Sequence, residues 1–183
     1  MNNFMLDLET LGLKSDSVIL TIGIVQFDLK TGKTGAEVEI ALDWQDQVNN
    51  RAKIDANTVK WWMEQEDAAI KTLVKKHMVT VKRSAEIIKE FFDKNCKDLR
   101  ETKLWGNGVS FDNVMLRNLY ARHDCNFPLP YWCDNDVRTL VTLCDINPSD
   151  YPFTGIKHNA IDDCKHQIKY CCDGYEKLTM GDL

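Results

Sequence analysis

The first 42 residues alternate between apolar and polar positions in a way that predicts three β-strands. Residues 4–8 form a short apolar run, and residues 18–27 form a longer run rich in β-branched side chains. A Lys-Thr-Gly-Lys turn signal at 30–33 separates the second run from residues 36–42, where polar and apolar side chains alternate. These three segments predict an antiparallel meander.

Two helices are predicted between this meander and the middle of the chain. Asp55 or Asn57 is suited to cap a helix that carries residues 61–63, because both side chains accept hydrogen bonds from first-turn N–H groups. Ser84 is suited to cap a second helix, whose apolar side chains recur on one face. That face consists of Ile87, Ile88, Phe91 and Phe92.

The second half of the chain alternates between strand and helix patterns. Strands are predicted at 104–106 and 131–133, a loop at 147–155, and helices after Ser110, over 137–143 and over 159–177. A meander followed by β-α alternation is typical of an α/β fold with a mixed central sheet flanked by helices. We expect one domain spanning residues 1–183.

Composition and charge narrow the class of protein. The chain has 183 residues, 44% hydrophobic and 28% charged, as in an ordinary globular protein with a sizeable core. The formal charge of −5 argues against a broad basic surface, but not against a small cleft that holds metal ions. No apolar run approaches the roughly 20 residues of a membrane span, and the first residues do not resemble a signal peptide. Seven cysteines without a C-x-x-C pair indicate reduced thiols. We therefore expect a cytoplasmic protein without membrane contact.

Asp7 and Glu9 are the first candidate site residues. On a strand they project to the same face, with Cα atoms roughly 6.5–7 Å apart. Two carboxylates aimed into one site repel each other, and a divalent cation relieves that cost. Two cations roughly 3.5–4 Å apart would suit in-line displacement at phosphorus. Taken alone, the pair is more simply explained as two solvated acids at a strand end.

Two further polar patterns lie downstream. The run 107–112, Asn-Gly-Val-Ser-Phe-Asp, places Asp112 at the start of a helix, where an acid also complements the helix dipole. The run 158–163, His-Asn-Ala-Ile-Asp-Asp, follows the predicted loop and opens the last helix. Each has a simpler explanation when taken alone, namely a first-turn acid and a surface histidine.

Together the patterns D-x-E-T, N-x-x-x-F-D and H-x-A-x-x-D, in this order, resemble the DEDD exonucleases of the histidine subclass (DEDDh). That superfamily includes proofreading subunits of DNA polymerases, ribonuclease T and oligoribonuclease, and the resemblance spans Asp7 to Asp163. The sequence between the motifs is most similar to that of small phage and prophage 3′–5′ exonucleases. The similar pieces are the first ten residues and the runs at 105–108, 136–140 and 158–163.

The resemblance implies a ribonuclease H-like fold with a mixed five-stranded sheet flanked by helices. It implies that two Mg²⁺ or Mn²⁺ ions are held by four acids and that His158 is the general base. The implied metal ligands are Asp7, Glu9, Asp112 and Asp163, which also count as catalytic. Helical i, i+4 spacing would instead pair His158 with Asp162. The family spacing selects Asp163, and Asp162 is then a first-turn acid.

The implied reaction is metal-dependent 3′–5′ exonucleolytic hydrolysis to nucleoside 5′-monophosphates. DNA is the favoured substrate, an exoribonuclease is the alternative, and single-stranded 3′ ends are favoured. We expect the enzyme in the cytoplasm of a bacterial or phage-infected cell, and the sequence leaves homo-oligomerisation open. An aspartyl phosphatase is disfavoured because it needs D-x-D-x-[TV]. A non-catalytic binding module is disfavoured because all four acids and the histidine are present.

Substrate contacts are predicted less directly. By resemblance, backbone N–H groups of residues 10–12 bind the terminal 3′-hydroxyl. The full set of predicted contacts is Thr10, Leu11, Gly12, Asn107, Phe111 and Trp62. Aromatic side chains can stack on bases, although core packing is the simpler explanation for each one taken alone. Further aromatic candidates are Trp61 and Phe153. The candidate phosphate contacts are Arg117, Arg122 and Arg138, although a solvated surface position is the simpler explanation for each one alone.

Overall fold

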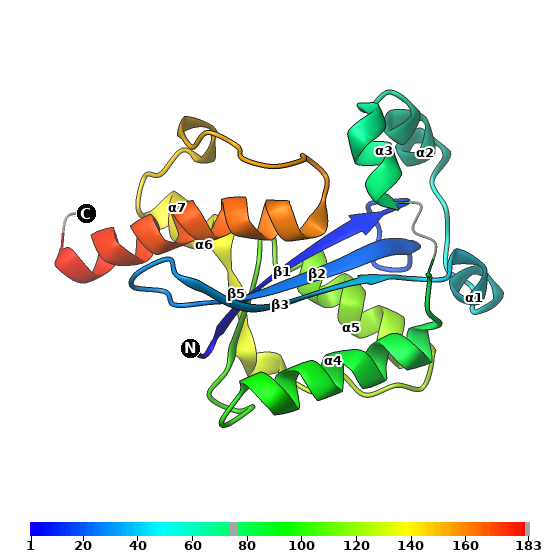
Figure 1. Cartoon of the computed structure of the whole chain (residues 1–183), viewed down its shortest axis with the longest axis horizontal. Coiled ribbons are helices and arrows are strands. Elements are labelled where there is room, and N and C mark those ends of the chain that lie inside the picture. Colours follow the sequence, from blue (N-terminus) through cyan, green and yellow to red (C-terminus); the bar gives the residue numbers. More distant parts are fainter. Residues whose placement is uncertain (74–76, 182–183) are drawn as a thin grey trace.

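A computed structural model describes residues 1–73 and 77–181, and its centre is a mixed five-stranded sheet (Figure 1). The strand order is β3-β2-β1-β4-β5. Strands β1, β2 and β3 pair antiparallel, while β4 pairs parallel to β1 and β5 parallel to β4. The sheet confirms the predicted meander and the mixed α/β architecture. The strands are β1 (Asn3–Thr10), β2 (Ile19–Phe27), β3 (Thr34–Ala41), β4 (Lys103–Gly106) and β5 (Asp134–Asp136).

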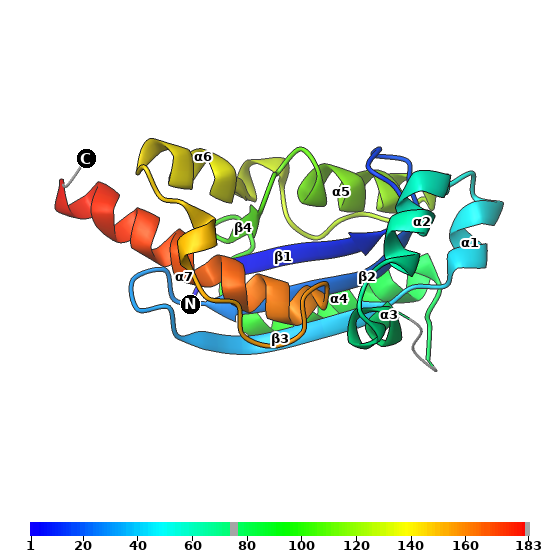
Figure 2. The same ribbon diagram turned by 90° about the horizontal axis from the view of Figure 1, so that it is seen from above.

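Helices cover both faces of this sheet (Figures 1 and 2). Helices α4 and α5 pack on one face, α6 and α7 pack on the other, and α2 and α3 stand beyond the carboxyl end of β1. Among the described residues, no helix is long and apolar enough to cross a membrane. The helices are α1 (Trp44–Asn49), α2 (Ala56–Met63), α3 (Asp67–Leu73), α4 (Val81–Asn95), α5 (Asp112–Arg122), α6 (Val137–Leu143) and α7 (Ala160–Met180).

Alternation along β1 gives its two faces different roles. Phe4, Leu6 and Leu8 are buried in the core beneath α4 and α5. Met5 is buried in the core formed with α6 and α7. Because side chains alternate along a strand, the carboxylates at positions 7 and 9 point toward the α7 side. The predicted common face of these two acids is therefore confirmed.

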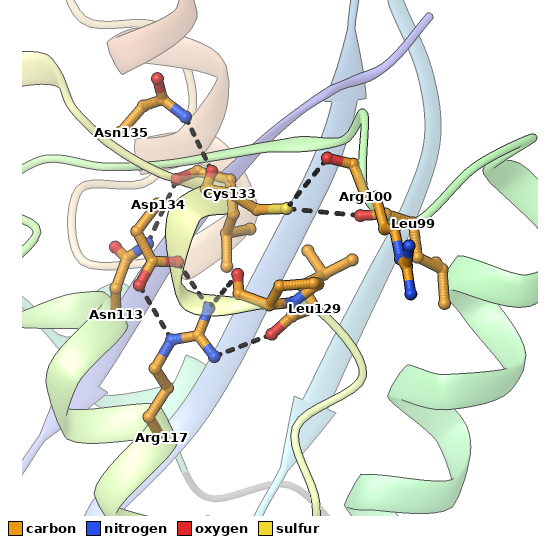
Figure 3. A network of polar contacts seen from close by, with 10 residues as sticks. Leu99, Arg100, Asn113, Arg117, Leu129, Cys133, Asp134 and Asn135 are labelled. Carbon is orange, nitrogen blue, oxygen red and sulfur yellow. Dashed lines mark hydrogen bonds and ion pairs between the residues drawn. The ribbon is translucent and has the colours of Figure 1, made fainter.

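One predicted strand is wrong by three residues. Residues 131–133 form a 3₁₀ helix, and the strand that pairs with β4 is the next segment, Asp134–Asp136. Its side chains are all polar and do not alternate with apolar ones, because they bind neighbouring segments instead of entering the core. Arg117 holds Asp134 through two contacts of 2.8 Å, and Cys133 Sγ donates to the Leu99 carbonyl (Figure 3). Asp136 caps α6.

The helix caps were predicted with mixed success. Asp55, one of the two candidates, caps α2 by accepting from Asn57 N–H at 2.8 Å. The predicted cap Ser84 is wrong, because α4 begins one turn earlier and Thr80 caps it. Ser84 instead lies buried within the helix, where its hydroxyl bonds the Val81 carbonyl at 2.7 Å.

Candidate active site

Acidic side chains from three separate segments converge at the end of β1. Glu9, His158 and Asp163 present ligand atoms that all lie within 4.8 Å of one another. Asp7 is the preceding residue on the same strand face, and its carboxylate accepts from Gln167 of α7 at 2.7 Å. Asp112 is buried at the first position of α5.

Gly23 lets α7 begin directly above the acidic strand. It is the cross-strand neighbour of Asp7 on β2. A Cβ atom at position 23 would lie only 2.7 Å from the carbonyl carbon and from Cβ of Ala160. Ala160 is itself fully buried as the first residue of α7. Two small residues in contact therefore bring the start of α7 against the sheet, and with it His158 and Asp163.

The start of α7 decides which aspartate faces Glu9. His158 precedes the helix with φ of 63°, and Asn159 is the N-cap. Helical i, i+4 spacing therefore does not apply to His158. Asp162 turns back to the preceding loop, where its Oδ2 accepts from Ile156 N–H at 2.9 Å. Asp163 is the residue that joins His158 at Glu9.

Asp112 is carried by a turn that β5 and α6 hold in place. The turn follows β4 and contains Gly108 with φ of 124°. Asp136 Oδ1 accepts from Val109 N–H at 2.7 Å, which ties the turn to the end of β5. The Arg138 guanidinium lies over Gly108, 3.4 Å from the place a Cβ would occupy. The turn therefore has a fixed shape where it presents the third acid.

Burial raises the pKa of all four carboxyl groups, and repulsion between the acids adds to this effect at Asp7 and Glu9. Burial is the main cause that raises the pKa of Asp7 well above its usual value. The charges of Glu9, Asp112 and Asp163 raise it further. Burial and neighbouring carboxylates raise the pKa of Glu9 to about 9. Burial raises the pKa of Asp112 to about 7 and that of Asp163 to about 6. A group of buried acids of this kind favours a bound cation.

The donor set fits a hard divalent cation. Among the described residues, no hydrogen-bond donor reaches the buried Oδ2 atom of Asp163. The candidate ligands are mostly carboxylate oxygens, which Mg²⁺ and Mn²⁺ prefer. Burial and the charge of Lys157 lower the pKa of His158. The imidazole is therefore neutral at neutral pH and keeps a lone pair that can accept a proton.

An apolar hollow of about 410 Å³ opens beside Glu9. Helix α2 forms one wall, and Trp62 of that wall donates its indole N–H to the Thr10 carbonyl at 2.9 Å. The sequence predicted several lining residues but not Leu8, Leu13, Asn57 and Thr58. Leu13 follows the predicted contact Gly12, and Asn57 and Thr58 follow the cap of α2. The lining residues are Leu8, Glu9, Thr10, Leu13, Asn57, Thr58, Trp61, Trp62 and Phe111.

Other predicted contacts have different surroundings. The Leu11 N–H already donates to the Val18 carbonyl at 2.8 Å, so this predicted contact is engaged within the protein. Asn107 lies in the turn before Asp112 and does not line this hollow. Phe153 lines a second hollow of about 560 Å³, which His158 also lines.

The three candidate arginines differ from one another. Arg117 is committed to Asp134 and to two backbone carbonyls, so the structure gives it a structural task (Figure 3). The guanidinium nitrogens of Arg122 are buried at the end of α5. Arg138 is exposed, and its charge lowers the pKa of Asp112. Of the three, Arg138 is the one placed beside the acids.

The family model of the 3′-5′ exoribonuclease Rv2179c-like domain matches residues 2–173. The chain belongs to this family. It is therefore a 3′–5′ exonuclease, a hydrolase of phosphodiester bonds, as the DEDDh resemblance predicted. No match was found among curated protein sequences. The kinship with phage enzymes stays a prediction.

Solved structures share the fold of this exonuclease at low sequence identity. The nuclease domain of 3′hExo, a DEDDh family member bound to rAMP, has a TM-score of 0.65 and 10% identity, over 98% of this chain and 92% of that one. E. coli exonuclease I in complex with a dA16 oligonucleotide also has a TM-score of 0.65, with 15% identity over 98% of this chain and 42% of that one. A 3′-exonuclease that recognises the histone mRNA stem-loop has a TM-score of 0.60 and 12% identity, over 98% of this chain and 82% of that one. These likenesses support the ribonuclease H-like sheet.

Proposed function

We propose that residues 1–183 form one metal-dependent exonuclease domain that removes nucleoside 5′-monophosphates from single-stranded 3′ ends. The observation that carries the proposal is the meeting of Glu9, His158 and Asp163 within 4.8 Å, beside the buried Asp112 and the half-buried Asp7. An isolated group of buried carboxylates is costly, and a substrate phosphate would only add negative charge. Cations are what make such a site useful for phosphodiester chemistry.

The proposed cofactors are two Mg²⁺ or Mn²⁺ ions. Asp7, Glu9, Asp112 and Asp163 would hold them, which is supported by their burial and by the orphaned Asp163 Oδ2. Bound divalent cations supply positive charge that offsets the charge developing at phosphorus, and they make water a stronger nucleophile. Gln167, which donates to Asp7, fixes the orientation of that carboxylate.

His158 is the proposed general base. Its lowered pKa supports a neutral ring that accepts a proton from the attacking water at neutral pH. Its position beside Glu9 and Asp163 supports an action at the same centre as the acids. The attack releases the terminal nucleotide with its phosphate on the 5′ oxygen.

The hollow beside Glu9 is the proposed site of the terminal nucleoside. Its walls include Trp62 and Phe111, which offer apolar surface to a base. The backbone N–H groups of Thr10 and Gly12 are proposed to bind the 3′-hydroxyl. This arrangement would place the last phosphodiester toward the acids.

RNA is the proposed substrate class. The family description names a 3′-5′ exoribonuclease, and two polar side chains, Asn57 and Thr58, interrupt the apolar lining where a 2′-hydroxyl could bond. DNA is the second candidate, supported by the sequence resemblance to phage exonucleases. The seven free thiols support the cytoplasm of a bacterial or phage-infected cell as the compartment.

One assay tests the proposal. Single-stranded RNA and DNA of matched sequence, labelled at the 5′ end, are incubated with the protein and Mg²⁺, and the products are sized over time. We expect a ladder that descends one nucleotide at a time, faster on RNA, and that stops in EDTA. Immediate release of the labelled 5′ nucleotide, or full turnover in EDTA, would contradict the proposal. A faster ladder on DNA would reverse the substrate preference only.

A further inference from the structure

The ring of His158 is packed against two tryptophans of α2. The centroid of its imidazole lies 4.9 Å from that of Trp61 and 5.7 Å from that of Trp62. The interplanar angles are 81° and 84°, so each contact is edge to face. Such aromatic pairs are favourable beyond the area they bury. The imidazole therefore has one preferred orientation that depends on α2.

The backbone around His158 makes side-chain packing important. His158 adopts φ of 63°, which is unusual for a residue other than glycine. The residue before it and most of the loop that leads to it are exposed. The loop therefore contributes little side-chain packing of its own, and the rings of α2 supply it.

The two tryptophans are themselves fixed relative to the strand that carries Glu9. Trp62 is buried, and its indole N–H donates to the Thr10 carbonyl, one residue after Glu9. Trp61 packs on Trp62 at 4.9 Å and 70°. A chain of contacts thus runs from the end of β1 through Trp62 and Trp61 to the imidazole.

We propose that Trp61 is a positioning residue for the reaction, which acts by holding the His158 ring toward the acids. The inference rests on the proposed role of His158 as general base. It differs from base stacking, because Trp61 would act on the rate of the chemical step and through another side chain. Trp61 is the better probe of the pair, because it is 41% exposed and makes no hydrogen bond to the β1 end.

A double-mutant cycle tests the proposal. Single-turnover rates at saturating enzyme are measured for wild type, Trp61→Ala, His158→Ala and the double variant. The substrate carries an abasic sugar at its 3′ end, which removes stacking from the comparison. Trp61→Phe keeps an aromatic edge. Trp132→Ala is the matched control, since Trp132 is also exposed and packs edge to face on a neighbouring aromatic ring, Tyr131.

We expect Trp61→Ala to lower the single-turnover rate by about 10- to 100-fold, since small misplacements of a reacting group have effects of that size. Trp61→Phe should restore most of the rate, and Trp132→Ala should leave it unchanged. In the His158→Ala background, Trp61→Ala should cause no further loss. Equal losses in both backgrounds, or an unchanged rate in Trp61→Ala, would overturn the positioning role. Full activity of His158→Ala would instead overturn the proposed general base, so the two failures are distinguishable.

Discussion

Asp7 shows how a destabilising side chain can be retained for chemistry. Asp7 is half-buried, and burial together with neighbouring acids raises its pKa. Gln167 donates one hydrogen bond to it, which compensates only part of that cost. A bound cation would convert the same repulsion into binding energy. At this position, stability of the metal-free protein and activity are therefore expected to oppose each other.

Asp7→Asn should separate these two effects. The amide oxygen can still accept from Gln167, while the negative charge is removed. We expect nuclease activity to fall by about 10³-fold, equivalent to roughly 4 kcal/mol at the transition state. In EDTA at about pH 8 the melting temperature should rise, by about 2–4 °C for each kcal/mol gained. Asp150→Asn, an exposed acid, is the control and should change neither quantity. Near-normal activity would rule out Asp7 as a metal ligand.

At the scale of elements, the site depends on the contact between the β1–β2 pair and the start of α7. Strand β1 carries Asp7 and Glu9, and α7 brings Asp163 and the residue that precedes its cap, His158. Gly23 permits the contact, because any side chain at that position would meet Ala160. Three acids and the histidine therefore share one packing interface.

Gly23→Ala should damage activity more than stability. The added methyl group would push α7 from the sheet, at about 1–3 kcal/mol for overpacking. A shift near 1 Å would cost about 10²-fold in rate. Gly35→Ala is the matched control, because its Cβ would come closest to the flexible side-chain ends of Gln26 and Met1 rather than to backbone atoms. Chemical denaturation and a nuclease assay on both variants measure the two effects. Wild-type activity of Gly23→Ala would show that the helix can adjust without cost to the site.

The sequence predicts elements well where side chains report burial directly. The alternation in β1 predicts its two faces, because each side chain either enters a core or points at α7. The strand at 134–136 escapes prediction, because its pairing uses backbone atoms and its acids bind Arg117 and the cap of α6. The packing of α2 against His158 also escapes, because it joins residues about a hundred positions apart that no local pattern relates.

At the scale of the whole molecule, the acids link stability to pH and to metal. Glu9 has a usual pKa of 4.5 that the fold raises to about 9. The folded state therefore holds a proton that the unfolded state releases, and stability falls as pH rises between these values. The fold also raises the pKa of Asp112 to about 7 and that of Asp163 to about 6. These two acids therefore also make the folded state less stable as pH rises. Asp28 and Asp136 have the opposite effect, because hydrogen bonds lower their pKa. The stability that they contribute is lost as pH falls.

Thermal melts should reveal this linkage. In EDTA we expect the melting temperature to fall as pH rises from about 5 to about 9, and Glu9→Gln should flatten the slope. Added Mg²⁺ should raise the melting temperature most at the alkaline end, because metal binding displaces protons from the acids. A slope that is identical in wild type and Glu9→Gln would contradict the assignment. If Mg²⁺ left the melting temperature at alkaline pH unchanged, that result would argue against metal binding.

The tryptophan wall of the hollow also has an optical consequence. The chain has five tryptophans, and Trp61 and Trp62 line the hollow beside Glu9. A nucleotide that enters there would shield the exposed edge of Trp61 from water and alter its fluorescence emission. Subtracting the spectrum of Trp61→Phe would isolate that signal from the remaining indoles. The fluorescence of Trp61 can therefore report binding of a nucleotide in the hollow without an added dye. EDTA would prevent cleavage during the measurement.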